Sequence, residues 1–186
     1  MAAARRSLRS IRWRANAGSL SLLNGRAFTT AGDLQNSGSL ILGGQFTVNG
    51  RLSLASSSLL VFNLAAMQGG SASVSGTTSL GGTLAFNLSS SLEAQVTQNS
   101  TFTLLASTGL LSDSFSNVAD GQRLLTQDGK FTFLVNYGAE STFNVDDVIL
   151  SDAIEIVPEP STWTLLLGGV GAVFFMARRR NKAEKP

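Results

Sequence analysis

Short runs in which apolar and polar residues alternate fill the chain between residues 27 and 156. Examples are Ser39-Leu40-Ile41-Leu42 and Gln45-Phe46-Thr47-Val48. An alternation of period two places the apolar side chains on one face of an extended strand, so these runs predict β-strands. Gly43-Gly44 and Asn49-Gly50 separate such runs, and both dipeptides are signals for tight turns. The pattern therefore predicts a mainly β body.

The spacing of the apolar positions favours a short β-solenoid, a β-helix-like stack of coils. Leu40, Phe46, Leu52 and Leu59 follow one another at intervals of six, six and seven residues. Short strands at such regular intervals suit coils in which each turn of chain buries one face on the next. A β-sandwich built from hairpins is the alternative, and it expects turn signals about every 8–12 residues.

Toward the C-terminal part of the body the pattern changes and predicts a hairpin-rich end unit. Residues 100–105, 113–118 and 130–137 are predicted strands, and Asp120-Gly121 and Asp128-Gly129 are turn signals between them. A unit of this kind would close one end of the solenoid, whose exposed strand edge needs a cover.

A different kind of sequence begins at residue 157. Two prolines flank Glu159 in the segment Val157, Pro158, Glu159, Pro160, Ser161, which favours an extended backbone that an enzyme can grip. An uncharged, mostly apolar run of 17 residues then extends from Ser161 to Ala177. As a helix this run would be about 25 Å long, at the low edge of the range that spans a bilayer. We predict one C-terminal transmembrane helix.

Both ends of this run support the membrane interpretation. Arg178, Arg179 and Arg180 follow it at once, and the positive-inside rule keeps such a cluster in the cytoplasm and the body outside. The side chains expected to anchor the span in lipid are Trp163, Leu165, Leu166, Leu167, Val170, Val173, Phe174 and Phe175. The weakest alternative is a soluble intracellular protein in which this helix is buried, because its glycines would cost about 1 kcal/mol each in a soluble helix.

Composition and charge narrow the function further. The chain has no Cys and no His, which excludes disulfides and Cys-ligated metal and removes the commonest general base. Residues 1–26 hold six Arg and no acidic residue, whereas residues 27–160 hold eleven acidic and three basic residues, a net charge of −8. An acidic body argues against nucleic-acid binding, which needs a basic face. We therefore predict no catalytic residue, no metal site, no cofactor and no nucleic-acid partner.

The acidic residues of the body fit turns better than a site. Asp146, Asp147 and Asp152 could together bind a cation, but a solvated turn is the favoured interpretation. Glu93 and Glu140 stand alone along the sequence and form no evident pair of catalytic carboxylates. Three further aspartates fit turn positions, where Asp is favoured: Asp113, Asp120 and Asp128.

The first 26 residues are basic but contain no apolar stretch of the length that an export signal needs. We interpret residues 1–26 as a disordered or mis-started segment, residues 27–156 as the β-rich body and residues 157–186 as a sorting and anchor tail. The true start site and the export signal stay open.

The tail resembles the PEP-CTERM sorting domain of bacteria in three ordered elements: Pro158-Glu159-Pro160-Ser161, the short apolar helix and the arginine cluster. The resemblance implies that exosortase, a transpeptidase-like membrane protease, recognises the tail and cleaves near the Pro-Glu-Pro sequence. It also implies transfer to the cell surface or into exopolysaccharide. Exosortase, membrane lipid and exopolysaccharide are the expected partners.

The body resembles autotransporter-type β-strand repeats over residues 34–150. The residues that carry this resemblance are Phe62-Asn63-Leu64, Val74-Ser75-Gly76, Leu80-Gly81-Gly82-Thr83-Leu84, Phe102-Thr103-Leu104-Leu105, Phe115-Ser116-Asn117-Val118 and Val135-Asn136-Tyr137. The resemblance implies a right-handed parallel β-helix-like fold and no shared activity.

The sequence thus predicts an exported, envelope-anchored protein of the cell surface or matrix. Its role would be structural or adhesive, and it would not be an enzyme. The alternative is a carbohydrate-binding or carbohydrate-active protein on the same β-helix scaffold. The ligand of the body, its oligomeric state and the cleavage position stay open.

Overall fold

The computed structural model of the protein describes residues 14–65 and 70–156. The chain divides into two compact units, Met1–Glu155 and Ile156–Pro186, and the fold described below is that of the first. This unit is mainly β, with sixteen strands and one short helix in its described residues. The mainly β class predicted from the alternating pattern is therefore confirmed.

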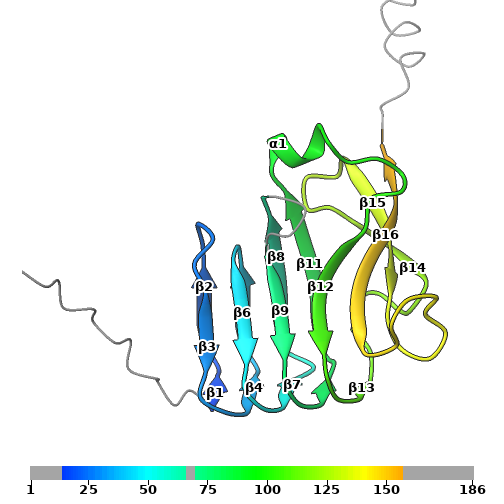
Figure 1. The fold of residues 1–186 in the computed structure, drawn as a ribbon. Helices are drawn as coiled ribbons and strands as arrows, with labels where there is room; N and C mark the ends of the chain where they lie inside the picture. The colour runs from blue at the N-terminus through cyan, green and yellow to red at the C-terminus, as the bar shows by residue number, and fades with distance from the viewer. Residues whose placement is uncertain (1–13, 66–69, 157–186) are drawn as a thin grey trace, which may run out of the picture. The chain divides into compact units, whose positions relative to one another are not determined.

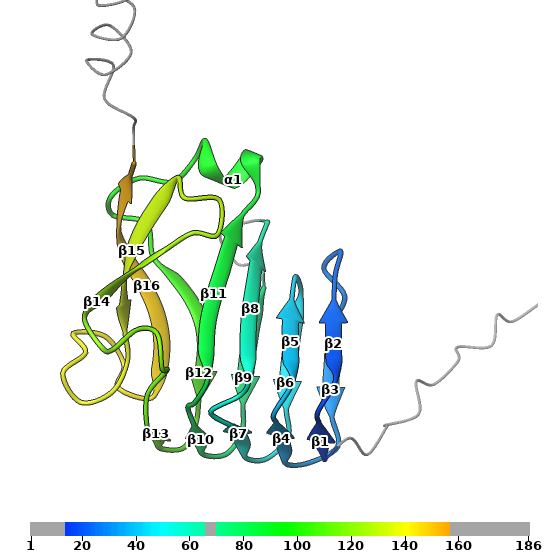
Figure 2. The ribbon, with the colours of Figure 1, turned by 180° about the vertical axis from the view of Figure 1, so that it is seen from behind.

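The strands form three sheets (Figures 1 and 2). The first sheet contains β1 (Ala15–Asn16), β4 (Leu34–Asn36), β7 (Leu52–Leu54), β10 (Thr78–Ser79) and β13 (Leu111–Ser112). The second contains β2 (Ser19–Leu22), β5 (Ser39–Leu42), β8 (Leu59–Leu64) and β11 (Thr83–Leu88). The third contains β3 (Phe28–Thr30), β6 (Gln45–Val48), β9 (Ser71–Val74), β12 (Phe102–Ser107), β16 (Asp147–Glu155), β15 (Phe131–Asn136) and β14 (Gln122–Leu125).

From β1 to β12 the chain visits the three sheets in turn, and each strand from β1 to β10 pairs with the third strand after it. We call each set of three successive strands a coil. Every pairing among β1 to β13 is parallel. A sandwich of hairpins, the alternative considered from the sequence, would instead pair consecutive strands in antiparallel fashion.

Parallel register places equivalent side chains of successive coils in rows. Leu20, Leu40, Leu60 and Leu84 form one such row across the second sheet. The last three are each only 1% exposed, and full burial of a leucine side chain contributes about 1.5–3 kcal/mol. A parallel row in the third sheet stacks Phe28 on Phe46, with ring centroids 5.9 Å apart and ring planes 6° from parallel.

Polar side chains also form rows, in which amide groups bond to one another from coil to coil. Nδ2 of Asn16 donates to Oδ1 of Asn36 at 2.7 Å, and this contact is buried. On the outer side of the second sheet, Nδ2 of Asn87 donates to Oδ1 of Asn63 at 2.9 Å. Each amide in these rows has a partner of its own kind, which lowers the cost of burying it.

The glycine pairs turn the chain between sheets, and they do not close hairpins. Gly43 and Gly44 connect β5 to β6, and Gly81 and Gly82 connect β10 to β11. Gly82 has a φ of +67°, and a Cβ atom at this position would clash with the carbonyl oxygen of Ser58 on the preceding coil. The corner therefore needs glycine both for its backbone conformation and for the close approach of two coils.

The C-terminal end of the stack is a unit of antiparallel strands, as the Asp-Gly turns predicted. β12 pairs with β16, β16 with β15 and β15 with β14, all antiparallel. Phe133 is fully buried and packs against the rings of Phe86 and Phe102 at centroid distances of 5.5 and 5.8 Å. Helix α1 (Ser90–Glu93) follows β11 and inserts Leu92, which is 1% exposed, into the same core.

The prediction of a strand over residues 113–118 was wrong. β13 ends at Ser112, and the residues that follow it form no strand in this described segment. The side chain of Asn117 instead accepts a hydrogen bond from the backbone N–H of Leu84 at 2.9 Å and donates to the carbonyl of Leu84 at 2.8 Å. A side-chain amide thus covers the outer edge of β11, and Phe115 and Val118 are buried from an irregular segment.

The body also starts earlier than the sequence indicated. β1 and β2 lie within residues 1–26, which were interpreted as a separate basic segment. β1 pairs with β4 and β2 pairs with β5, and Leu22 belongs to the core. Strands of two and four residues carry little periodicity of their own, so their place in the body depends on pairing that the local sequence does not reveal.

Replacement of Gly82 by alanine tests the corner. We expect Gly82→Ala to lower the free energy of unfolding by about 3 kcal/mol, from the left-handed backbone plus the clash with Ser58. Gly121 has a similar φ of +70° but nothing within 4 Å of a Cβ atom, so Gly121→Ala should cost only about 1–2 kcal/mol. Urea unfolding of both variants measures the difference, and equal losses would contradict the close approach.

Acid titration tests the turn between β14 and β15. The Thr126 hydroxyl donates to the Asp128 carboxylate at 2.6 Å and holds the pKa of Asp128 at about 2, below its usual 3.8, with help from Lys130. This bond therefore adds stability above pH 3.8 that is lost as the pH falls toward 2. Because the side chain is 37% exposed, the gain should stay below about 1 kcal/mol.

The free energy of unfolding of wild type, Asp128→Asn and Thr126→Val should be measured between about pH 5 and about pH 2. This range includes the usual pKa of an aspartate, 3.8, and the lowered pKa of Asp128, about 2. Both variants should show a flatter loss of stability across this range than wild type. Identical slopes in all three proteins would contradict the assigned role of Thr126.

Candidate functional site

The sorting motif predicted at residues 157–161 follows the last strand of the body directly. β16 lies between β12 and β15 in the third sheet, and Glu155 near its end pairs with Phe131 of β15. Ile156 is exposed. The body therefore ends in a strand whose last residues pair with β15, and this strand ends one residue before the motif begins (Figure 1).

The predicted tail residues themselves lie outside the described residues. They are Val157, Pro158, Glu159, Pro160 and Ser161 of the motif, Trp163, Leu165, Leu166, Leu167, Val170, Val173, Phe174 and Phe175 of the predicted span, and Arg178, Arg179 and Arg180 of the predicted anchor. Within residues 14–65 and 70–156, no helix has the length and apolar character that crossing a membrane requires.

The aspartates of the body hold turns and strand ends in place. Oδ1 of Asp146 accepts the backbone N–H of Leu111 at 3.1 Å, and Oδ1 of Asp147 accepts the backbone N–H of Ser107 at 3.3 Å. Asp152 accepts a hydrogen bond from Gln98 at 3.0 Å. Asp146 lies in a turn, as the sequence predicted, whereas Asp147 and Asp152 lie in β16. Each of the three carboxylates accepts a hydrogen bond from a distant segment of the chain.

Two acidic residues of the end unit form ion pairs. Asp152 forms an ion pair with Arg123, and Glu93 forms one with Lys130 at 2.7 Å. Glu93 lies in α1, whereas Glu140 lies in the loop between β15 and β16, so each belongs to a different part of the end unit. Among the residues that the structure describes, no group of three or more acids is placed to hold a metal ion.

A groove with a volume of about 520 Å³ lies in the end unit. This volume falls in the range of small-molecule sites. Its walls bring together amides and carboxylates with one exposed ring, and the residues that matter here are Gln98, Asn99, Asp120, Asn136, Glu140 and Phe143. They come from three separate segments, the turn before β12, the turn before β14 and the region from β15 to the loop that follows it.

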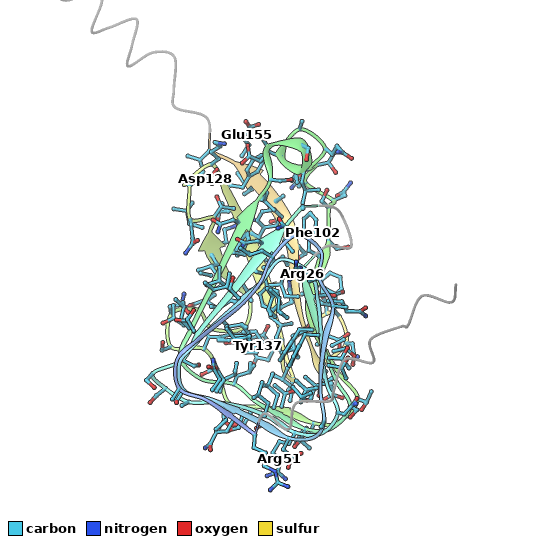
Figure 3. All side chains as sticks on the ribbon, turned by 90° about the vertical axis from the view of Figure 1, so that its left-hand side faces the viewer. Arg26, Arg51, Phe102, Asp128, Tyr137 and Glu155 are labelled. Atoms are coloured by element: carbon cyan, nitrogen blue, oxygen red, sulfur yellow. The ribbon has the colours of Figure 1, made fainter. Side chains whose placement is uncertain are left out.

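Carboxylates line the groove together with the apolar side chains of Leu134 and Phe143, and one of the carboxylates, that of Asp120, is bonded to the neighbouring backbone. Asp120 accepts the backbone N–H of Tyr137 at 2.8 Å, and the Tyr137 hydroxyl donates to the carbonyl of Val118 at 2.6 Å. Burial raises the pKa of Tyr137, and the negative charge of Asp120 adds to this effect. Figure 3 shows Tyr137 among the side chains inside the unit. The backbone N–H of Tyr137, a residue with a buried side chain, thus holds Asp120 in position at the groove.

Sequence reasoning missed this groove. Asp120 was placed in a turn and Glu140 was treated as isolated, whereas both line the same cavity. The available signal was Phe143, an aromatic residue in the mostly polar loop between β15 and β16, which is 38% exposed. Nothing in its local sequence links it to Gln98 and Asn99, because only the antiparallel pairing of β12 with β16 brings the segments together.

Comparison with known proteins gives one match, at the tail. The PEP-CTERM protein-sorting motif matches residues 157–180. No curated protein and no solved structure matches the chain. The autotransporter-type repeats expected in residues 34–150 therefore gain no support from relatives. The match covers the Pro-Glu-Pro sequence, the apolar run and the arginine cluster, so the sorting motif predicted from these elements is confirmed. The chain carries a PEP-CTERM protein-sorting motif, which indicates exosortase-dependent sorting of a secreted, envelope-associated protein.

Proposed function

We propose that this protein is an exosortase substrate whose body has a structural or adhesive role at the cell surface or in the extracellular matrix. The observation that carries the proposal is the sorting motif at residues 157–180, which begins one residue after the last described residue of the body. The motif supplies the sorting signal, and the body is the part that is delivered. Exosortase acts on the tail, and the prolines and Glu159 are recognised without catalysing anything.

The body is a short β-solenoid in this proposal. Three observations support it: parallel pairing of strands three elements apart, side chains in rows from coil to coil, and glycine corners between sheets. A stack of this kind presents outward rows of polar side chains, such as Thr29, Thr47 and Ser73 in the third sheet. Such a surface suits contact with other matrix components better than turnover of a substrate.

The apolar run from Trp163 to Ala177 is proposed to hold the protein in the inner membrane until it is processed, with the arginine cluster in the cytoplasm. Membrane lipid is then a transient partner. The body needs no enzymatic activity for this role. Hydrolysis of a polysaccharide by the purified protein, abolished by Asp120→Asn or Glu140→Gln, would contradict the non-enzymatic assignment.

Replacement of Glu159 tests the sorting proposal in a host that carries exosortase. Mass spectrometry of the C-terminus with cell fractionation should find wild-type protein shortened near Pro158 and outside the inner membrane. Glu159→Ala, and separately Arg178→Ala with Arg179→Ala and Arg180→Ala, should leave full-length protein in the inner membrane. Glu155→Ala is the matched control, because Glu155 is an exposed acid four positions upstream, outside the motif.

Two results would contradict the proposal. An intact C-terminus on wild-type protein in every fraction would leave a membrane anchor without processing. Equal processing of Glu159→Ala and Glu155→Ala would mean that the Pro-Glu-Pro sequence is not what the protease reads.

The groove favours carbohydrate binding as a second function of the body. Amide and carboxylate groups from Asn99, Asp120 and Glu140 can bond to sugar hydroxyls, and Phe143 offers an exposed aromatic face. Exopolysaccharide would then be retained by the protein after export. Because the charged groups of the groove walls are carboxylates, repulsion should disfavour acidic polymers.

Affinity electrophoresis of the full chain in detergent-containing gels with dextran or alginate tests this second function. We expect retardation by neutral dextran and none by anionic alginate. Phe143→Ala should reduce the retardation about tenfold or more in apparent affinity, since an aromatic contact contributes about 0.5–1.5 kcal/mol beyond the area that it buries. Phe143→Tyr keeps the ring and should bind as wild type does. Equal mobility with and without both polymers would contradict carbohydrate binding by this groove.

A further inference from the structure

The two halves of β16 are held differently. From Asp147 to Leu150 the strand pairs with β12 on one side, and Ile149 and Leu150 also pair with β15 on the other (Figure 1). Residues 151–155, which we call the C-terminal half of β16, have β15 as their only neighbouring strand among the described residues. Of residues 152–156 only Ala153 is buried, so detachment of this half would expose little apolar surface.

A β-bulge interrupts the pairing of this half. Between the pairs Leu134–Ser151 and Thr132–Ile154, β15 has one residue and β16 has two. The first of the two, Asp152, has a φ of +48°, a left-handed conformation that is unfavourable for a residue with a side chain. A bulge also breaks the regular ladder of backbone hydrogen bonds. The backbone pairing with β15 is therefore weakened at Asp152.

Two residues from other segments hold the bulge in place. Nη1 of Arg123 donates to the carbonyl oxygen of Asp152 at 2.9 Å, and the guanidinium group forms an ion pair with the Asp152 carboxylate. Nε2 of Gln98 donates to the same carboxylate at 3.0 Å, and the Gln98 carbonyl accepts the backbone N–H of Ala153 at 3.2 Å. The side chains of the ion pair are 31% and 33% exposed, and exposed ion pairs contribute little to stability.

The sorting motif lies within a short reach of this strand. Pro158 is three residues beyond Glu155, and three residues span at most about 11 Å. A folded unit of this size has a radius of gyration of about 14 Å, so a bond near Pro158 stays close to the body. A protease needs exposed backbone without hydrogen-bonded partners on both sides of the bond that it cleaves. An enzyme that works near Pro158 thus needs residues that the structure places in or directly after β16.

We propose that the C-terminal half of β16 is a conformational gate for processing of the tail. When the gate is closed, this half is paired with β15 and held at Asp152. When it is open, the strand is detached as far as the bulge and residues 152–156 become extended substrate, while residues 147–150 stay in the sheet. This inference rests on the proposal that exosortase processes the tail. Where a strand end opens and closes faster than it is cleaved, the rate of cleavage follows the open fraction.

A disulfide between β15 and β16 tests whether the gate must open. The chain has no Cys, and Thr132 and Ile154 lie opposite each other, at a separation that suits a disulfide. In a host that carries exosortase, pulse-chase with mass spectrometry of the C-terminus measures the rate of processing. We expect the oxidised Thr132→Cys, Ile154→Cys protein to be processed at least about tenfold more slowly than the same protein after reduction.

A disulfide elsewhere in the body is the matched control. Gln35 and Ser53 lie opposite each other in β4 and β7 of the first sheet, whereas β16 belongs to the third. The Gln35→Cys, Ser53→Cys protein should therefore be processed at the same rate when oxidised and when reduced.

Loss of the contacts at Asp152 should have the opposite effect. Arg123→Ala removes the ion pair and the bond to the Asp152 carbonyl, and should raise the rate of processing about two- to fivefold. Arg51→Ala is its control, because Arg51 bonds to Thr77 in the coil stack, and this variant should match wild type. Processing of Arg123→Ala at the rate of Arg51→Ala would overturn the assigned role of Arg123.

A flexible spacer distinguishes the gate from misfolding of the Cys variant. Eight Gly and Ser residues inserted between Ile156 and Val157 add a reach of up to about 26 Å, so the oxidised Thr132→Cys, Ile154→Cys protein should then be processed as fast as its reduced form. A spacer that does not restore processing would overturn the gate, as would equal rates for both forms without the spacer. Wild-type protein that keeps an intact C-terminus would overturn the sorting proposal itself, and the gate with it.

Discussion

Backbone hydrogen bonding between strands three elements apart is the constraint on which the rest of the body depends. This pairing fixes which residues of successive coils lie opposite one another, and these residues must be compatible. Leu20 lies opposite Leu40, Phe28 opposite Phe46 and Asn16 opposite Asn36. A shift of one residue in any coil would turn its apolar set outward. The glycine corners serve the same constraint, because successive coils approach too closely there for a Cβ atom.

Body and tail divide the work of the protein between them. In the described residues of the body, most acidic side chains accept hydrogen bonds at turns and strand ends or form ion pairs. The tail contains the sorting motif. The junction between them lies at the end of β16, whose last residues pair with β15, whereas its pairing with β12 ends at Leu150.

Much of this arrangement could be predicted from the sequence, and the failures have identifiable physical causes. Alternation revealed β5, β6, β8 and β11 because their rows are strictly apolar on one side. The Gly-Gly pairs gave the positions of turns but not their kind, since the same dipeptide closes a hairpin or turns a corner.

The strand expected at residues 113–118 was absent, because Asn117 replaces backbone pairing with its side chain. The groove near Phe143 and the early start at Ala15 both depend on contacts between distant segments. The tail motif was readable because its three elements are ordered along the sequence.

The repeating register between coils also bears on how such a protein can change over time. Leu34 lies opposite Leu52, eighteen residues later, and this step contains one strand of each sheet. Duplication or loss of one such unit in the middle of the stack would keep both ends, the groove and the tail intact. It would alter the length of the body by about 4.8 Å, the spacing of neighbouring strands. The number of coils thus sets the length of the body between its N-terminal end and its end unit.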